Sequence, residues 1–389
     1  MAEIWILFSI SSILFLSPFL SRYLYIPTPS VEIILGAIAA YYGFVNDFYL
    51  FELTAHVGFF YLMFMAGTEV DLKMFVSIPK DVLKKGVVYL LLLYIFSSIS
   101  VLYLELHPVL IIIIPTLSVG LILALYKDYG KNTNWLNLSM LIGTMGELIS
   151  ISLLTFAGAA LNFGIGLELY RAVTYLLLLL VALVIVFKFL HVLFWWYPEI
   201  KIFLMPHTDK EEKDLRLSMA LFFIMIGIML MLHLEVAFGA FLAGIFIATF
   251  FDHKKELPHK ISSFGFGFLV PIFFIYIGST LDLQSLRNDN IIQLALLITV
   301  LMLGVRIISA FVFAQNLKTL DIFRYALSQA MPLTLMIAIA TIAYNSQTID
   351  NILYAALILS AVLEVIIVMV SIKILSAIDQ KKAENIVKK

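Results

Sequence analysis

Residues 110–120 read LIIIIPTLSVG, an apolar run that Pro115 interrupts and that the hydroxyl groups of Thr116 and Ser118 follow. A proline removes one backbone N–H and clashes with the preceding turn, so a helix is usually broken or kinked there. Apolar residues continue on both sides over 108–126, which is about the length needed to cross a bilayer. The stretch therefore predicts a membrane helix that is discontinuous near its middle.

The composition of the whole chain places this stretch in a membrane protein. Of 389 residues, 62% are hydrophobic and only 13% are charged, whereas soluble domains are roughly 45–50% apolar and about 25% charged. This excludes an ordinary soluble enzyme, a disordered chain and a nucleic-acid-binding protein, which would need a basic surface. The chain has no cysteine, which excludes disulfides and thiolate catalysis, and it has no HExxH or GxSxG motif. We expect neither enzymatic activity nor a cofactor.

Thirteen apolar stretches are candidates for membrane spans, which predicts an all-α polytopic membrane protein with about 13 transmembrane helices. The first stretch lacks the basic residues that begin a signal peptide, so we interpret it as a retained span. No soluble regulatory domain is expected after the last one, only a charged tail. The predicted spans are 4–24, 29–44, 52–67, 85–105, 108–126, 136–160, 168–196, 215–232, 235–251, 262–282, 290–315, 322–344 and 350–377.

The positions of the basic residues predict the orientation. With the N-terminus outside, 22 of the 25 Lys and Arg residues fall in cytoplasmic loops or at cytoplasmic helix ends, as the positive-inside rule requires. Arg171 and Arg287 lie outside, and Arg306 lies within a span. We therefore expect a multi-pass protein of the cell (inner) membrane with an outside N-terminus and a cytoplasmic C-terminus.

The chain also resembles itself at an offset slightly above 200 residues. An odd number of spans, seven, separates each matched pair, which predicts a six-plus-six inverted repeat with 168–196 as a linker helix. Inverted repeats with interrupted helices at equivalent positions are typical of secondary transporters, and the interruptions indicate the substrate site. The matches are Pro115 with Pro332, Glu147 with Glu364, GTEVDL at 67–72 with GSTLDL at 278–283, and LGA at 35–37 with FGA at 238–240.

Three ionisable residues lie well inside predicted spans: Glu147, Arg306 and Glu364. Each costs roughly 2.5–3.5 kcal/mol to insert, so a functional role is the first hypothesis. Glu147 shares a helix face with small and polar residues and should face the interrupted span. A carboxylate beside hydroxyls and freed carbonyls suits Na⁺, Li⁺ or K⁺. The predicted ion- or proton-binding residues are Glu147, Ser118, Thr116 and Thr144. The alternative is a purely structural Glu147 that pairs with Arg306.

Arg306 keeps its charge and must pair with a carboxylate or with carbonyl groups. One possibility is a structural pair with Glu364, which would leave Glu147 free to exchange ions. The other is a pair with Glu147 that a bound cation displaces. We favour the second, because an unpaired anion at Glu147 would be costly without a cation. Ser328, Gln329 and Thr334, next to Pro332, are further candidates for lining the site.

Three motifs resemble the Kef-type branch of the monovalent cation:proton antiporters: FMAGTEVDL at 64–72, GAFLAG at 239–244 and PIFFIYIGSTLD at 271–282. The resemblance implies two crossed discontinuous helices, a basic residue in span 11 that Arg306 matches, and a homodimer. The chain departs from the family where Gly146-Glu147 replaces an Asn-Asp, Gln-Asp or Asp-Asp pair. The implied regions are a dimerisation scaffold at 1–80 and 215–285, an ion-transport core at 85–160 and 290–378, and the linker at 168–196.

The sequence thus predicts an antiporter that exchanges a monovalent cation, Na⁺ or K⁺, for protons by alternating access. A single exchanging carboxylate predicts a one-for-one, electroneutral exchange. The alternatives are a carrier of another solute on a related fold and a non-transporting membrane sensor or scaffold. The expected partners are the lipid bilayer, protons and the transported cation, which is the only metal expected at Glu147.

Overall fold

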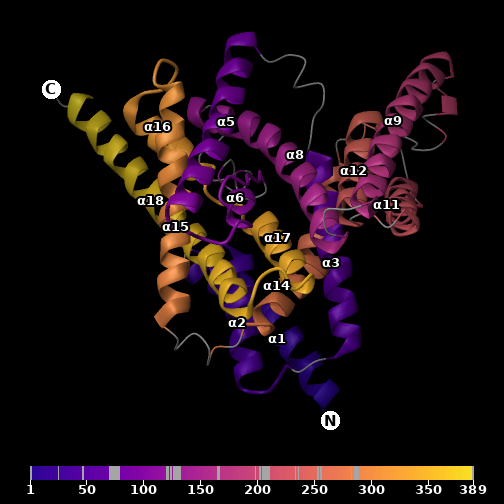
Figure 1. Cartoon of the computed structure of the whole chain (residues 1–389), viewed down its shortest axis with the longest axis horizontal. Coiled ribbons are helices and arrows are strands. Elements are labelled where there is room, and N and C mark those ends of the chain that lie inside the picture. Colours follow the sequence, from indigo (N-terminus) through magenta and orange to yellow (C-terminus); the bar gives the residue numbers. More distant parts are fainter. Residues whose placement is uncertain are drawn as a thin grey trace. The chain divides into compact units, whose positions relative to one another are not determined.

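The computed structural model of the chain is built from helices (Figure 1), so the predicted all-helical class is confirmed for the part that the structure describes. Parts of two repeat motifs, at 70–72 and 282, lie outside the described residues, as do 120–121 and 123–124. The structure describes residues 2–24, 26–45, 48–69, 79–119, 133–163, 167–197, 199–200, 211–232, 236–251, 256–281 and 289–387, with the single positions 122, 125, 203, 234, 254 and 283.

Ten helical stretches of the described chain are long and apolar enough to cross a membrane, and two shorter apolar helices accompany them. These amount to about 10–12 crossings, against the thirteen predicted. The difference arises at 108–126, where only the short helix α6 (Leu110–Ile113) is a described element. The last helix continues to Val387, beyond its predicted end at 377.

The longer helices follow the predicted spans within a few residues at most of their ends. Each consists of an apolar run that satisfies its own backbone groups, as a bilayer requires. The helices are α1 (Ala2–Leu24), α2 (Thr28–Tyr41), α3 (Tyr49–Glu69), α5 (Lys80–Tyr103), α8 (Asn134–Phe163), α9 (Leu167–Trp196), α11 (Lys213–Met231), α12 (Val236–Phe250), α13 (Leu257–Phe264), α14 (Val270–Ser279), α15 (Asp289–Ala310), α16 (Thr319–Ser328), α17 (Leu333–Asn345) and α18 (Asn351–Val387).

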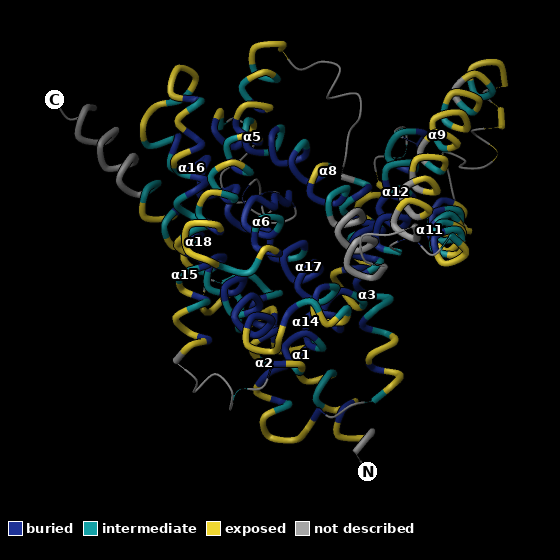
Figure 2. The backbone as a smooth tube through the Cα atoms, viewed as in Figure 1, coloured by how far each residue is buried: buried dark blue, intermediate teal, exposed yellow. Residues whose placement is uncertain are grey.

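Helix α9 shows how the apolar exterior fits a membrane. None of its most apolar 18-residue window is buried, and Figure 2 shows most of the helix as exposed. Trp195 and Trp196 are exposed at its end, with their rings edge to face at 5.5 Å. An apolar helix surface of this length is stable in contact with lipid, and tryptophans anchor helix ends at the membrane interface.

The chain divides into two compact units. Unit 1 consists of Met1–Leu16, Glu32–Ser77 and Thr155–Thr280, and unit 2 of Ser17–Val31, Ile78–Leu154 and Leu281–Lys389. In unit 1, α3 packs against α12 and α14, and α11 packs against α12. In unit 2, α15 packs against α18, α16 and α5, and α17 packs against α18.

Glycines set the close helix packing in unit 1. A Cβ placed on Gly67 of α3 would collide with the Phe241 carbonyl of α12, and one placed on Gly244 would collide with the Phe64 carbonyl of α3. Gly36 and Gly278 likewise bring α2 and α14 together, because each faces the other helix's backbone. Small residues let membrane helices approach closely and gain van der Waals contact.

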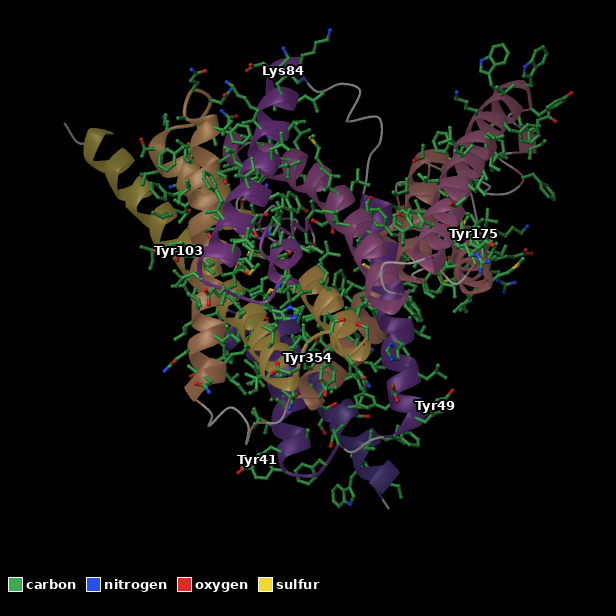
Figure 3. The ribbon with its side chains drawn as sticks, viewed as in Figure 1. Tyr41, Tyr49, Lys84, Tyr103, Tyr175 and Tyr354 are labelled. Carbon is green, nitrogen blue, oxygen red and sulfur yellow. The ribbon has the colours of Figure 1, made fainter. Side chains whose placement is uncertain are left out.

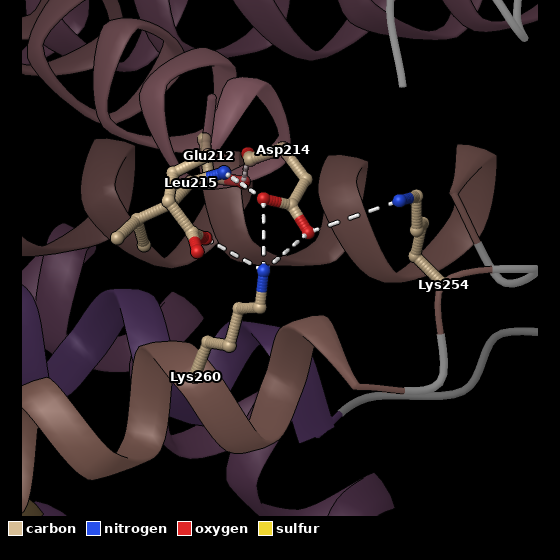
Figure 4. Close-up of polar contacts among 6 residues, drawn as sticks. Glu212, Asp214, Leu215, Lys254 and Lys260 are labelled. Carbon is tan, nitrogen blue, oxygen red and sulfur yellow. Dashed lines mark hydrogen bonds and ion pairs between the residues drawn. The ribbon is translucent and has the colours of Figure 1, made fainter. Parts of the chain in front are cut away.

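A buried acidic group begins α11 in unit 1. Asp214 is 2% exposed, and one of its carboxylate oxygens accepts the N–H of Leu215 at 2.8 Å. The ammonium group of Lys260 lies 3.3 Å from Asp214 and 2.6 Å from Glu212, and that of Lys254 lies 4.0 Å from Asp214 (Figure 4). These ion pairs join α11 to α13 and compensate the buried charge of Asp214.

Filling the glycine contact between α3 and α12 should destabilise unit 1. We expect Gly67→Val and Gly244→Val each to cost at least about 1–3 kcal/mol, the usual cost of overpacking, because the colliding atoms belong to the backbone. The measurement is the thermal denaturation midpoint in detergent. Gly227→Val is the matched control, because no atom lies within 4 Å of a Cβ there. Equal midpoints for the three variants would contradict this packing.

Candidate ion-binding site

The helix of the fifth predicted span ends immediately before Pro115. Helix α6 stops at Ile113, the Thr116 N–H donates to the Ile113 carbonyl at 3.1 Å, and residues 116–119 are not helical. The proline cannot donate, and the described residues that directly follow it, 116–119, lie outside the helix. The backbone groups of this segment are therefore available for contacts with other helices.

The twelfth predicted span is interrupted in the same way. Helix α16 ends at Ser328 and α17 begins at Leu333, with Pro332 as the residue that precedes it. The Pro332 carbonyl accepts the Met336 N–H at 2.8 Å and so opens the new helix. The residue before a proline avoids the helical conformation, which places the interruption at 329–332. The two interruptions meet where the hydroxyl oxygens of Ser118 and Thr334 lie 3.4 Å apart.

Glu147 lies in the middle of α8 and faces the first interruption. Its side chain is buried, with the residue 1% exposed. One carboxylate oxygen accepts the Ser118 hydroxyl at 3.0 Å, and the other accepts the Val119 N–H at 3.3 Å. Ser150, one turn further along α8, accepts the Leu117 N–H at 3.1 Å. Donors freed by the helix break thus bind the carboxylate and its neighbour.

Arg306 of α15 binds the acceptors of both interruptions. It is fully buried, and its Nε donates to the Gln329 carbonyl at 2.9 Å while a terminal nitrogen donates to the Thr116 carbonyl at 2.6 Å. The other terminal nitrogen donates to the Met302 carbonyl of its own helix at 2.9 Å. Because carbonyl groups at a helix end attract cations, a guanidinium stabilises both broken ends at once.

The acidic partner of Arg306 is Glu364. Their nearest nitrogen and oxygen are 3.9 Å apart, and both side chains are fully buried. Among the described residues, no ion pair joins Arg306 to Glu147, so the pairing that we favoured from the sequence is wrong for this structure. The carboxylate oxygens of Glu364 have no hydrogen-bond donor among the described residues. Arg306 instead directs its hydrogens at carbonyl groups.

Two of the predicted ion-binding residues do not bring their hydroxyls to Glu147. Thr116 donates its hydroxyl to the Ile113 carbonyl at 2.6 Å and joins the Arg306 cluster through its own carbonyl. Thr144 donates to the Met140 carbonyl at 2.7 Å within α8. Threonine hydroxyls often return to the preceding turn of their own helix. Ser118 is the predicted residue whose hydroxyl contacts the carboxylate.

The structure adds one polar contact that the sequence interpretation missed. The Thr299 hydroxyl of α15 lies 2.9 Å from the Ser360 hydroxyl of α18. Thr299 precedes Arg306 by seven residues and Ser360 precedes Glu364 by four, so each shares a helix face with a charged residue. This spacing in the sequence could have predicted that the polar faces of α15 and α18 are in contact.

The geometry suits a group that holds either a proton or a small cation. Glu147 offers two carboxylate oxygens next to the Ser118 hydroxyl oxygen and near Thr334, all of them hard ligands. No group of three or more His, Cys, Asp or Glu residues that could hold a resident metal ion occurs in the described part of the chain. The chemistry available here is therefore reversible binding at one carboxylate.

Comparisons with known proteins identify the family of the chain. Residues 10–377 match the family profile described as "Sodium/hydrogen exchanger, transmembrane", which confirms the resemblance and the multi-pass membrane class inferred from the sequence. YjbQ of Bacillus subtilis, named as a candidate Na⁺/H⁺ antiporter, is 27% identical over 95% of this chain. The match covers 63% of YjbQ, so the chain spans less than two thirds of that relative's length.

A second relative and one solved structure point the same way. A candidate Na⁺/H⁺ antiporter 3 of Methanocaldococcus jannaschii is 25% identical over 79% of both chains. The solved structure of the sodium proton antiporter MjNhaP1, from the same organism, superposes with a TM-score of 0.64 and covers 96% of this chain and 97% of its own. At 15% identity this likeness concerns the fold alone.

A double-mutant cycle can test the pairing of Arg306. Arg306→Met leaves Glu364 without its cation and three carbonyls without their donor, so we expect a loss of about 3–5 kcal/mol. Adding Glu364→Gln should recover part of that loss, whereas adding Glu147→Gln should not, because only the first pair is in contact. The measurement is the thermal denaturation midpoint in detergent. The pairing would be contradicted if Glu147→Gln, and not Glu364→Gln, restored stability when added to Arg306→Met.

Proposed function

Because the chain belongs to the sodium/hydrogen exchanger family, we propose that it is a secondary antiporter that exchanges a monovalent cation, Na⁺ or K⁺, for protons. The family consists of transporters and not of enzymes, as the sequence predicted. The observation that carries the proposal is the buried Glu147 carboxylate, which lies against a helix interruption and accepts one hydroxyl and one N–H. The names of the two relatives support Na⁺ as the first cation to test.

Competition at Glu147 would couple the two substrates. A deprotonated Glu147 attracts a cation, and a protonated one does not, so the two ions exclude each other at one carboxylate. The Ser118 hydroxyl donates to the carboxylate and can rotate to offer a lone pair when a cation binds. If the site opens to one side of the membrane at a time, this competition produces exchange. With one such carboxylate, the exchange is one cation for one proton and electroneutral.

The proposed architecture is a thirteen-span, six-plus-six inverted repeat whose two interrupted helices cross. The reciprocal glycine contacts support it, because α2 packs on α14 as α3 packs on α12. In this packing Gly244, rather than the predicted Gly239, takes the role of Gly36, since a Cβ on Gly239 would meet Met229 of α11. The assignment of 1–80 and 215–285 to a scaffold and of 85–160 and 290–378 to the transport core, and a homodimer formed through the scaffold, belong to the same proposal.

The proposed orientation has an outside N-terminus, a cytoplasmic C-terminus and a location in the cell membrane. Its support is the distribution of basic residues: Lys80, Lys84 and Lys85 gather at the first turns of α5, and the end at Tyr103 has none (Figure 3). Cytoplasmic loops of membrane proteins are enriched in Lys and Arg.

Replacement of the exchanging carboxylate should abolish transport. In vesicles with an imposed pH gradient, we expect Na⁺- or K⁺-dependent proton flux from the wild-type protein, and at least a hundredfold lower flux from Glu147→Gln. Ser118→Ala should weaken cation binding about tenfold, which corresponds to about 1.4 kcal/mol, since it removes one ligand. Ser152→Ala is the matched control, because its hydroxyl donates within α8. Full exchange by Glu147→Gln would falsify the site.

The absence of native cysteine permits a direct test of orientation. Single cysteines at Lys84 and Asn345, both exposed, should react with a membrane-impermeant maleimide from opposite sides. We expect Asn345→Cys to be labelled on intact cells and Lys84→Cys to be labelled on inverted vesicles. The reverse pattern would overturn the orientation without affecting the assignment of the site.

A further inference from the structure

The side-chain amide of Gln329 is buried, and within the described chain its nitrogen is hydrogen-bonded whereas its oxygen is not. The residue is 1% exposed, and its Nε2 donates to the Ser139 carbonyl of α8 at 2.7 Å, which fixes the amide orientation. Its Oε1 has no hydrogen-bond partner among the described residues. Buried side-chain oxygens in native proteins nearly always have a partner, and an exception indicates a bound water, an ion or a functional role.

The unbonded oxygen faces the same stripe of α8 as Glu147. A Cβ placed on Gly143 would lie 3.3 Å from Oε1, 3.0 Å from Ile122 Cδ1 and 3.1 Å from Val119 Cγ1, so the amide oxygen lies beside the position where α8 has no side chain, next to two methyl groups. Gly143 precedes Glu147 by four residues, which is one helical turn or about 6 Å along the axis. The two oxygen groups therefore lie along one face of the same helix.

Two hydroxyl groups accompany this amide. The oxygens of Ser139 and Ser328 are 2.7 Å apart, and each hydroxyl also lies 2.8 Å from a backbone carbonyl, that of Trp135 or Tyr325. The two hydroxyl groups together carry two hydrogens and four lone pairs. The contact between them uses at most one lone pair, so the other lone pairs remain available. Neutral oxygens of amide and hydroxyl groups are hard ligands that suit alkali cations, and they bind more weakly than a carboxylate.

The neighbouring positive charge is compensated. Arg306 contacts Gln329 only through the backbone carbonyl, at 2.9 Å, and two further carbonyls and the Glu364 carboxylate surround the guanidinium. This contact also fixes the backbone from which the amide extends. The side-chain oxygen is thus held in place by one bond to α15 and one to α8.

We propose that Gln329 Oε1, with the hydroxyl oxygens of Ser139 and Ser328, forms a second and weaker site for the transported monovalent cation, one helical turn from Glu147. The proposal rests on the proposed antiport function. On the proposed orientation, the site lies on the cytoplasmic side of Glu147, because it is nearer to the N-terminal end of α8. A cation would exchange part of its hydration shell for these oxygens before it reaches the carboxylate, so the site would act on affinity and not on the exchange step.

Transport kinetics separate this role from a structural one. In proteoliposomes, Gln329→Met, which keeps the length and removes the oxygen, should raise the apparent KM for Na⁺ about tenfold and leave the maximum rate within about twofold. Gly143→Ala, whose methyl group would press on Oε1 as well as on Ile122 and Val119, should raise KM in the same direction. The matched control is Gly304→Ala in α15, where no atom lies within 4 Å of the new Cβ, and its KM should be unchanged. An unchanged KM in Gln329→Met overturns the proposal whatever Gly143→Ala does, because Gly143→Ala also meets Val119, whose N–H donates to Glu147.

A binding measurement makes the test independent of transport. Glu147→Gln protein in detergent should retain weak ²²Na⁺ binding, and Glu147→Gln/Gln329→Met should lose it. Equal binding by the two variants overturns the second site. Absence of cation-dependent proton flux from the wild-type protein would instead overturn the proposed function, so the two failures are distinguishable.

Discussion

The hydrogen bonds of Arg306 to three backbone carbonyls are the interaction on which unit 2 depends. A membrane interior offers no water to an unpaired carbonyl, and it offers none to a guanidinium. Each helix interruption creates free carbonyls, and the charge of Arg306 needs acceptors. The guanidinium bonds to Thr116 in one interruption and to Gln329 in the other, so one buried charge stabilises two broken helices. In the membrane, the free carbonyls of the interruptions and the buried charge of Arg306 each require the other as a partner.

The same division of backbone groups determines the contacts of Glu147. A break in a helix frees acceptors on one side and donors on the other. Arg306 takes the acceptors, and Glu147 takes the Val119 N–H and the Ser118 hydroxyl. The guanidinium is paired with Glu364 and not with Glu147. In the described part of the chain, the hydrogen-bond donors to Glu147 are therefore neutral, the Ser118 hydroxyl and the Val119 N–H. Neutral donors can be displaced or reoriented by a cation more easily than a salt bridge can be broken.

The sequence predicted the elements of this arrangement better than their contacts. The cost of charge in a membrane identified Glu147, Arg306 and Glu364, and the chemistry of proline identified both interruptions. Helical periodicity places Thr144 on the face of Glu147, but it cannot show that the hydroxyl returns to Met140. The segment 116–119 has no helical period, so the sequence could not choose between Thr116 and Ser118. The pairing of Arg306 depends on how α15 and α18 are rotated, which no local pattern encodes.

An inverted repeat alone would give its two acidic residues equal environments, so the difference between them must come from residues at equivalent positions. The offset of 217 that relates Glu147 to Glu364 relates Ser118 to Leu335 and Tyr89 to Arg306. Glu147 therefore faces a hydroxyl where Glu364 has an apolar counterpart, and Glu364 faces a guanidinium where the first half has a tyrosine. Tyr89 is fully buried and packs edge to face on Tyr325 at 5.4 Å. On the proposed repeat, one half keeps a fixed ion pair for structure, and the other keeps a carboxylate that neutral groups alone surround. The difference at these two positions thus supports the proposal that Glu147, and not Glu364, exchanges ions.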